Sequence, residues 1–262
     1  MLLVADVGNS HTVFGLYHDQ SLKEQWRLVT DTHRVADEWG IFLLGLLQSV
    51  GIDRSIVQHA ALASVVPEVT PELVAALGKY LHCDARVVKA SDIPGITLNV
   101  DEPYAVGVDR IINVFAARQL VRGPAIVVDF GTATTFDVLS ARDEFLGGAI
   151  APGIGIAAEA LYSHAALLPR IAIAAPPAAI GRTTVTNMQS GIVLGYASLV
   201  DGLVGRIMAE LGERATVFAT GGWSQVIGHL CQGIDRIAPA LTLNGLATLW
   251  HLRESEAVSD DR

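Results

Sequence analysis

The spacing of apolar and polar residues along the chain predicts an order of strands and helices that occurs twice. Short apolar runs predict strands over about residues 1–7, 12–18 and 22–29, and a helix follows from Ala36 to Val50. The first half continues with a strand near His59–Val65, a helix over Pro71–His82, a strand at Ala85–Val88 and a helix over Gly107–Val121. Gly123-Pro124 then ends this half of the chain.

The second half begins with the same arrangement. Strands are predicted over 124–130, 133–139 and 144–150, with a helix near Gly155–Ala165. Three strands followed by alternating helices and strands, present twice, indicate a duplicated α/β architecture with a mixed sheet in each half. We therefore expect two half-domains, 1–122 and 123–262, of which residues 253–262 form a polar, frayed tail.

A long apolar helix and a glycine-rich turn complete the predicted order. The helix runs from about Thr183 to Leu211, and its apolar positions cover more than one face. It is therefore either a core helix or part of a subunit interface, and these alternatives stay open. A strand at Ala215–Ala219, the turn Thr220-Gly221-Gly222, a helix through Ile227 and a last helix over Leu243–Leu252 follow.

The strongest chemical signal is a short motif that the chain carries twice. An apolar strand ends in Asp6-Val7-Gly8-Asn9, and another ends in Asp129-Phe130-Gly131-Thr132, 129 − 6 = 123 positions later. Beyond the turns, Thr12 and Thr135 occupy matching positions at the same spacing. Glycine lets a phosphate approach the backbone, turn amides can bind its oxygens, and the aspartates can hold an accompanying cation. One copy alone would be an ordinary hairpin turn, whereas the pair predicts two facing half-domains that close on one nucleotide.

Composition narrows the class of protein. The 262 residues are 51% hydrophobic and 17% charged, and the net charge of −9 disfavours nucleic acid as a partner because no Lys/Arg cluster is present. Cys83 and Cys231 are expected to be buried thiols, with neither a disulfide nor a zinc site. Although mean hydropathy is +0.41, we expect no signal peptide and no membrane-spanning segment, and hence a cytoplasmic protein. His11 lies in the first turn, where exposure to solvent is the simpler interpretation.

These features together resemble the superfamily of acetate and sugar kinases, hsp70 and actin, and within it the type III pantothenate kinases. The resemblance runs through nearly the whole chain, in ordered blocks: Asp6–Ser10, Gly107–Arg110, Asp129–Asp137, Leu146–Gly153, Leu168–Arg170, Ile180–Thr184, Met188–Gly191 and Ala219–Gly222. It implies actin-like (ribonuclease H-like) half-domains with a nucleotide cleft between them. The implied activity is ATP-dependent phosphorylation of pantothenate to 4'-phosphopantothenate, the first step of coenzyme A biosynthesis.

The resemblance also implies roles for individual residues. The first turn would bind ATP through Asp6, Val7, Gly8, Asn9, Ser10, His11, Thr12 and Val13, together with Thr132 of the second turn. Asp109 would be the general base, and Asp129 would bind potassium or ammonium, with Mg²⁺ accompanying ATP. Pantothenate would contact Val100, Gly107, Val108, Asp109, Arg110 and Thr184. A homodimer is the usual assembly of this family.

Several points leave alternatives open. Without the resemblance, Asp109 in front of Arg110 could equally be a carboxylate that caps a helix. Ser10 and the sequence Gly181-Arg182-Thr183-Thr184 depart from the usual family pattern, and Val100 stands where some members have an aromatic substrate contact. A non-catalytic regulatory homologue, or a kinase for another small hydroxyl compound, would keep the same nucleotide turns.

Overall fold

The computed structural model describes residues 1–260, with side chains described as far as residue 255. The chain forms two compact units. The first contains Met1–Pro94, Tyr104–Ala116 and the described residues from Thr242 onward, and the second contains Gly95–Pro103 and Ala117–Leu241.

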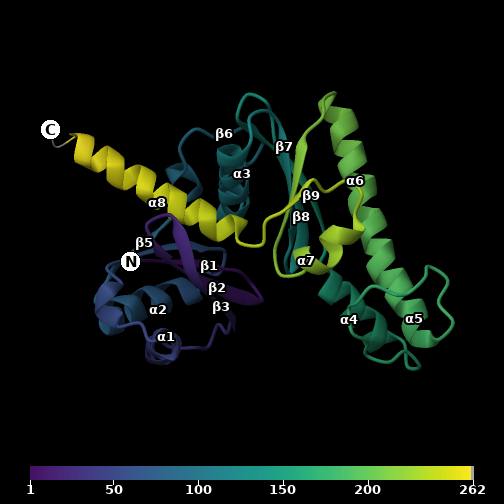
Figure 1. The fold of residues 1–262 in the computed structure, drawn as a ribbon, viewed down its shortest axis with the longest axis horizontal. Helices are drawn as coiled ribbons and strands as arrows, with labels where there is room; N and C mark the ends of the chain where they lie inside the picture. Colours follow the sequence, from purple (N-terminus) through teal and green to yellow (C-terminus); the bar gives the residue numbers. More distant parts are fainter. Residues whose placement is uncertain (261–262) are drawn as a thin grey trace. The chain divides into compact units, whose positions relative to one another are not determined.

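The first unit is built on a five-stranded mixed sheet in the order β3-β2-β1-β4-β5. The strands β1 (Leu2–Val7), β2 (His11–His18) and β3 (Ser21–Val29) are antiparallel, while β4 (His59–Ser64) and β5 (Asp84–Val87) continue the sheet in parallel from β1. Helices α1 (Ala36–Ser49) and α2 (Val69–Ala76) pack on one face of this sheet through a core that includes Trp39, Leu43 and Leu73 (Figure 1).

Two further helices complete the first unit. Helix α3 (Val108–Leu120) contributes its residues up to Ala116, and helix α8 (Leu241–Asp260) contributes almost its whole length. The Tyr17 hydroxyl of β2 donates a hydrogen bond of 2.6 Å to the side-chain oxygen of Asn244, which fixes α8 to the sheet. Helix α8 continues to Asp260, past its expected end at Leu252, so the residues expected to fray are helical as far as the structure describes them. Residues 261–262 of the expected tail lie outside the described part.

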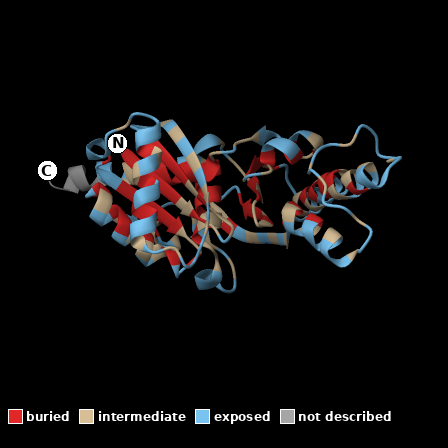
Figure 2. Cartoon of the chain, turned by 90° about the horizontal axis from the view of Figure 1, so that it is seen from below, coloured by how far each residue is buried: buried red, intermediate tan, exposed pale blue. Residues whose placement is uncertain are grey.

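The second unit repeats the arrangement with a six-stranded sheet in the order β11-β10-β7-β8-β9-β6. Strands β7 (Ala125–Phe130), β8 (Ala133–Leu139) and β9 (Glu144–Pro152) are antiparallel. On one side β10 (Thr216–Thr220) and β11 (Arg236–Ile237) add in parallel, and on the other β6 (Thr97–Leu98) pairs in parallel with β9. The buried residues of both units concentrate in these strands and in the helices that cover them (Figure 2).

The helices of the second unit lie after β9. They are α4 (Ile154–His164), α5 (Thr184–Gln189), α6 (Gly195–Leu211) and α7 (Ser224–Ile227). A π-helical turn at Ser190–Leu194 joins α5 to α6, so the predicted long helix is one continuous helical run, Thr184–Leu211. Short 3₁₀ turns occur at Arg54–Ile56, Ala90–Asp92, Pro103–Ala105 and Gly228–Leu230, and a second π-helical turn follows α2 at Leu77–Leu81.

The long helical run differs from one expectation. We expected no segment that could span a membrane, yet Thr184–Leu211 is long and apolar enough to do so by length and composition, with 33% of its most apolar window buried. A core helix of a water-soluble protein passes the same test, so this property by itself is weak evidence for a membrane.

The predicted duplication is confirmed, since each unit contains an antiparallel three-stranded meander extended by parallel strands. The two compact units do not coincide with a single division at residue 122, because α8 and the start of α3 group with the first sheet. The very short strands β6 and β11 were not predicted, because two residues carry no readable pattern.

Candidate functional site

The first Asp-x-Gly turn is closed by hydrogen bonds with the start of β2 and with the residue that follows β3. The Gly8 amide donates to the His11 carbonyl at 3.1 Å, and the Thr30 amide at the end of β3 donates to the Ser10 carbonyl at 3.0 Å. The Thr30 hydroxyl donates to the Gly8 carbonyl at 2.7 Å and lies 2.9 Å from the hydroxyl of the fully buried Thr12. Two threonines therefore fix the shape of the turn from its inner side.

Asp109 lies in the same unit, at the start of α3 and close to this turn. Gly107, at the start of this segment, packs against Val65. A Cβ atom at position 107 would lie 3.5 Å from Cγ1 of Val65. The Val65 amide in turn donates to the Val7 carbonyl at 3.1 Å, directly beside the motif aspartate Asp6. The structure thus brings the Gly107–Arg110 segment to the carboxyl end of β1, where the first turn begins.

The carboxylate of Asp109 is held by its own loop. Its Oδ1 accepts a hydrogen bond of 2.9 Å from the Arg110 amide and occupies the space that a side chain on Gly107 would need. Burial raises the pKa of Asp109, and the opposing effects of the Arg110 amide and the Arg110 charge are smaller. Arg110 therefore favours the charged form of Asp109, but its influence on the pKa is smaller than that of burial.

The second turn is enclosed by two glycines from other parts of its unit. The Gly131 amide donates to the Ala133 carbonyl at 3.1 Å, and the Gly153 amide after β9 donates to the Thr132 carbonyl at 3.1 Å. Gly221 follows β10 with a φ of +86°, and a side chain there would collide with the Asp129 carboxylate and, at 2.7 Å, with the backbone of Phe130. Asp129 and Thr132 are therefore placed at the carboxyl ends of β7 and β10.

The two turns differ in length, which corrects one prediction. Asp6 pairs with Val13 in the first hairpin, whereas Asp129 pairs with Thr135 in the second, so the second turn is one residue shorter. The structural counterpart of Thr12 is consequently Thr134, not Thr135. Both are fully buried, and the Thr134 hydroxyl accepts a hydrogen bond of 2.8 Å from the hydroxyl of Tyr196 on α6.

The remaining predicted contacts, Val100 and Thr184, lie in the second unit. The backbone before Val100 pairs with the start of β9, and Cγ1 of Val100 lies 3.5 Å from a Cβ built on Gly147. Thr184 is exposed at the first position of α5, after Thr183, whose hydroxyl accepts the Thr186 amide at 3.2 Å. Whether either side chain contacts a substrate stays a prediction.

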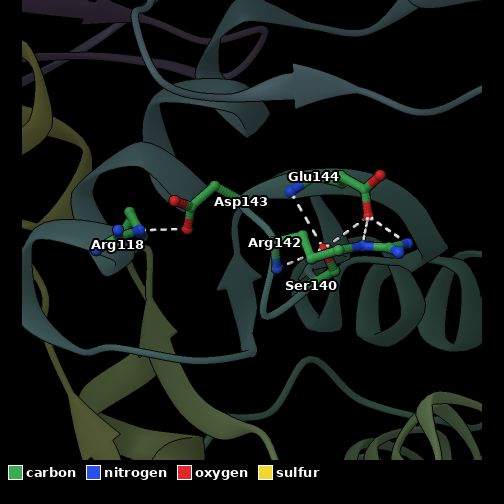
Figure 3. A network of polar contacts seen from close by, with 5 residues as sticks. All are labelled: Arg118, Ser140, Arg142, Asp143 and Glu144. Carbon is green, nitrogen blue, oxygen red and sulfur yellow. Dashed lines mark hydrogen bonds and ion pairs between the residues drawn. The ribbon is translucent and has the colours of Figure 1, made fainter.

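A polar network at the β8–β9 turn has a structural role. Arg118 of α3 donates to Asp143, while Ser140 and Arg142 both bind the Glu144 carboxylate at 3.0–3.1 Å (Figure 3). The Thr97 amide of β6 donates to the Asp143 carbonyl at 3.0 Å. This backbone hydrogen bond and the pairing of β6 with β9 hold the segment that leads to Val100 against the second sheet, next to the polar network.

Among the described residues no group of three or more His, Cys, Asp or Glu side chains could hold a metal ion. Mg²⁺ is often bound in proteins through one or two carboxylates together with phosphate oxygens, and Asp6 and Asp129 offer side chains of that chemical type. Cys83 and Cys231 are buried, as expected.

Solved structures share this fold across nearly the whole chain. A structure described as a Baf family transcriptional activator from Campylobacter jejuni has a TM-score of 0.57 at 20% identity and covers 97% of this chain and 99% of its own. The inorganic polyphosphate/ATP-glucomannokinase from Arthrobacter sp. strain KM has a TM-score of 0.51 at 14% identity, over 96% and 98% of the two chains. At these identities the likeness shows the actin-like α/β fold alone.

Sequence relatives are much closer. Type III pantothenate kinases from Moorella thermoacetica and Roseiflexus sp. (strain RS-1) are 46% and 44% identical, covering 95% and 97% of this chain and 98% and 100% of their own. The sequence model of the type III pantothenate kinase family matches residues 2–206. This chain belongs to the type III pantothenate kinase family.

Proposed function

We propose that this protein phosphorylates pantothenate with ATP, giving 4'-phosphopantothenate and ADP in the first step of coenzyme A biosynthesis. Family membership supports the activity, and one observation in the structure supports the mechanism. Asp109 is held at the start of α3, beside the strand end that carries the first Asp-x-Gly turn. A carboxylate and a phosphate-binding turn placed close together in one unit suit phosphoryl transfer, which depends mainly on positioning and charge stabilisation.

In this proposal the turns bind the nucleotide. Backbone amides and hydroxyls of Asp6–Val13 bind ATP phosphates, and Thr132 makes a further ATP contact. Asp129 would hold the monovalent cation, potassium or ammonium, and Mg²⁺ bound with the ATP phosphates would supply positive charge to offset theirs. The close approach of Gly221 to Asp129 supports such a role, because it leaves the carboxylate room that any larger residue would fill.

Asp109 acts as the general base toward the primary hydroxyl of pantothenate. The carboxylate accepts the hydroxyl proton as the oxygen attacks the γ-phosphorus, and the bond from that phosphorus to the bridging oxygen of ADP breaks. Gly107, Val108 and Arg110 would contact the acceptor, with Val100 and Thr184 as further contacts.

A coupled assay of ADP release tests the activity directly. Wild-type protein should release ADP with pantothenate in the presence of potassium, and Asp109→Asn should reduce kcat by roughly 10²-fold or more while ADP still binds. A screen of other small alcohols, with and without potassium, identifies a different acceptor if one exists. Near-normal turnover by Asp109→Asn would refute the base, and absence of turnover with every acceptor would favour a non-catalytic homologue.

We also propose that the protein is a cytoplasmic homodimer. The long helical run Thr184–Leu211 supports this assembly, since only 33% of its most apolar window is buried within the chain, and Val185 and Leu199 are exposed. Light scattering coupled to size-exclusion chromatography should give twice the mass of one chain. A strictly monomeric protein at micromolar concentration would contradict the dimer.

A further inference from the structure

The face of the first sheet that carries Asp6 also carries a basic residue. Asp6 pairs with Val13, and Val13 pairs with Arg27 of β3, so the three residues form one row across the sheet. Residues directly opposite each other on neighbouring strands share a face, and the apolar core under α1 and α2 takes the other face through Val7 and Phe14. Arg27 therefore belongs to the face that presents the motif aspartate.

Arg27 contacts His11, the turn residue that leads into β2. Nη2 of Arg27 lies 3.0 Å from Nδ1 of His11. Arginine only donates hydrogen bonds, so Nδ1 must accept, and the proton of the neutral ring is then on Nε2. Burial, followed by the Arg27 charge, lowers the pKa of His11, which keeps the ring neutral at physiological pH. The pair thus presents a fixed cation and an N–H donor beside the first turn.

Among the residues that the structure describes, Arg27 forms no ion pair with a carboxylate. Within the part of the chain that the structure describes, Arg118, Arg142 and Arg214 form ion pairs with acidic side chains, whereas Arg27 is exposed and bonds only to a neutral ring nitrogen. In a chain of net charge −9, an anionic ligand needs local positive charge of this kind. A guanidinium can also bind two phosphate oxygens at once.

We propose that Arg27 positions the phosphate groups of the nucleotide, binding them directly through its guanidinium and indirectly by holding His11 with its Nε2 proton available to a phosphate oxygen. The inference rests on the proposed function of the first turn as the ATP-phosphate site. It adds a residue from β3, more than a dozen positions beyond the motif, to the groups that bind the triphosphate.

Kinetics of Arg27→Gln test the direct contact, with Lys23→Gln as the matched control on the same strand. Lys23 is exposed on β3, so both substitutions remove one positive charge. Arg27→Gln should raise KM for ATP about 10- to 100-fold and leave KM for pantothenate within about twofold. Arg27→Lys, which keeps the positive charge, should raise KM for ATP less than Arg27→Gln does. The proposal would be overturned if Arg27→Gln had the same KM for ATP as Lys23→Gln. It would also be overturned if KM rose equally for ATP and for pantothenate while the melting temperature stayed unchanged.

Calorimetric binding of ADP and of inorganic pyrophosphate separates this inference from the proposed function. If the wild type binds both ligands but does not phosphorylate pantothenate, the proposed acceptor is wrong while Arg27 is still tested by pyrophosphate affinity. Weaker pyrophosphate binding by Arg27→Gln supports the contact, and unchanged binding overturns it. Nitrogen NMR of His11 gives an independent readout, in which the Nε2–H tautomer is expected and the Nδ1–H tautomer would overturn the positioning of the ring by Arg27.

Discussion

At the residue scale, the Gly-x-Asp-Arg block has a steric explanation. The Asp109 carboxylate folds back over Gly107 and accepts the Arg110 amide at 2.9 Å. The atom that a new Cβ would meet is the end of a movable side chain, while the next neighbour, Val65, is at an ordinary distance of 3.5 Å. A larger residue at position 107 can therefore be accommodated by moving the carboxylate.

We accordingly expect Gly107→Ala to impair catalysis more than folding. Displacement of the proposed base should lower kcat with pantothenate by roughly 10²-fold, because general bases contribute rate factors of that order only when correctly placed. The free energy of unfolding should change by less than about 1 kcal/mol. Parallel kinetics and urea denaturation measure both effects, and Gly78→Ala, in open space on the same unit, is the control. Full activity in Gly107→Ala would show that the carboxylate is not the base.

The raised pKa of Asp109 gives a second expectation at this scale. The proposed base works only as a carboxylate, so kcat/KM should fall as the pH drops through the folded-state pKa of Asp109, which lies above the ordinary value of 3.8. At a pH between the ordinary pKa of 3.8 and the folded-state pKa of Asp109, the folded state binds more protons than the unfolded state. The contribution of Asp109 to the free energy of unfolding therefore decreases as the pH rises through this range.

Rate profiles from about pH 4.5 to about pH 8 should therefore show an acid limb, and Asp109→Asn should be more stable than the wild type at neutral pH. Stability is read from chemical denaturation at both ends of the range. A rate that stays constant down to the lowest pH, in protein that remains folded, would place the base elsewhere or leave its pKa unshifted.

At the scale of elements, the hairpins were predictable and their exact correspondence was not. Each apolar strand, polar turn and second strand has a clear pattern, and the structure confirms both hairpins. The two motif aspartates are 123 positions apart, and applying the same spacing beyond the turns matched Thr12 with Thr135. The second turn is one residue shorter, however, and the sequence alone does not show this difference. The partner of each threonine becomes visible only once the strands are paired.

Residues that support the site were missed for the same reason. Thr30 and Tyr196 shape the turns through hydrogen bonds, and Val65 joins the Gly107 loop to β1 through its side chain and its amide, each with partners distant in sequence. Ordinary threonine, valine and tyrosine positions carry no local signal of such contacts. Motif aspartates and glycines do carry one, because few other residue types fit a phosphate-binding turn.

The turn after β10 provides a test at this scale. Gly221 and Gly212 both have positive φ, +86° and +72°, but a side chain on Gly212 meets open space while one on Gly221 meets Asp129 and the backbone of Phe130. Gly212→Ala should cost about 1 kcal/mol of unfolding free energy, from backbone strain alone. Gly221→Ala should cost at least about 3 kcal/mol of unfolding free energy and, under the proposed role of Asp129, weaken activation by potassium. If urea denaturation gave the same loss of unfolding free energy for Gly212→Ala and Gly221→Ala, the turn would not enclose Asp129 as described.

At the scale of the whole molecule, each compact unit combines segments that are far apart in the sequence, so the two units are not simply the first and second halves of the chain. The first unit is assembled from three separate segments, the last of which begins at Thr242. Leu243, Leu246 and Leu249 of α8 are almost fully buried, and Leu243 lies against Gly15 of β2. The motif that begins at Asp6 therefore belongs to a unit that is completed only by the final helix.

A fragment that ends at Leu241 should consequently lose order in its N-terminal part. Removing three buried leucines withdraws about 5–9 kcal/mol of burial free energy, comparable to the whole stability of a domain. Hydrogen exchange should then show loss of protection in β1, β2 and β3 but retained protection in β7, β8 and β10, whose core contains none of the deleted residues. A fragment that ends at Glu254 is the control and should keep both patterns. If the shorter fragment protects β1 as well as the full chain does, the first sheet folds without α8, and the two-unit description is wrong at this point.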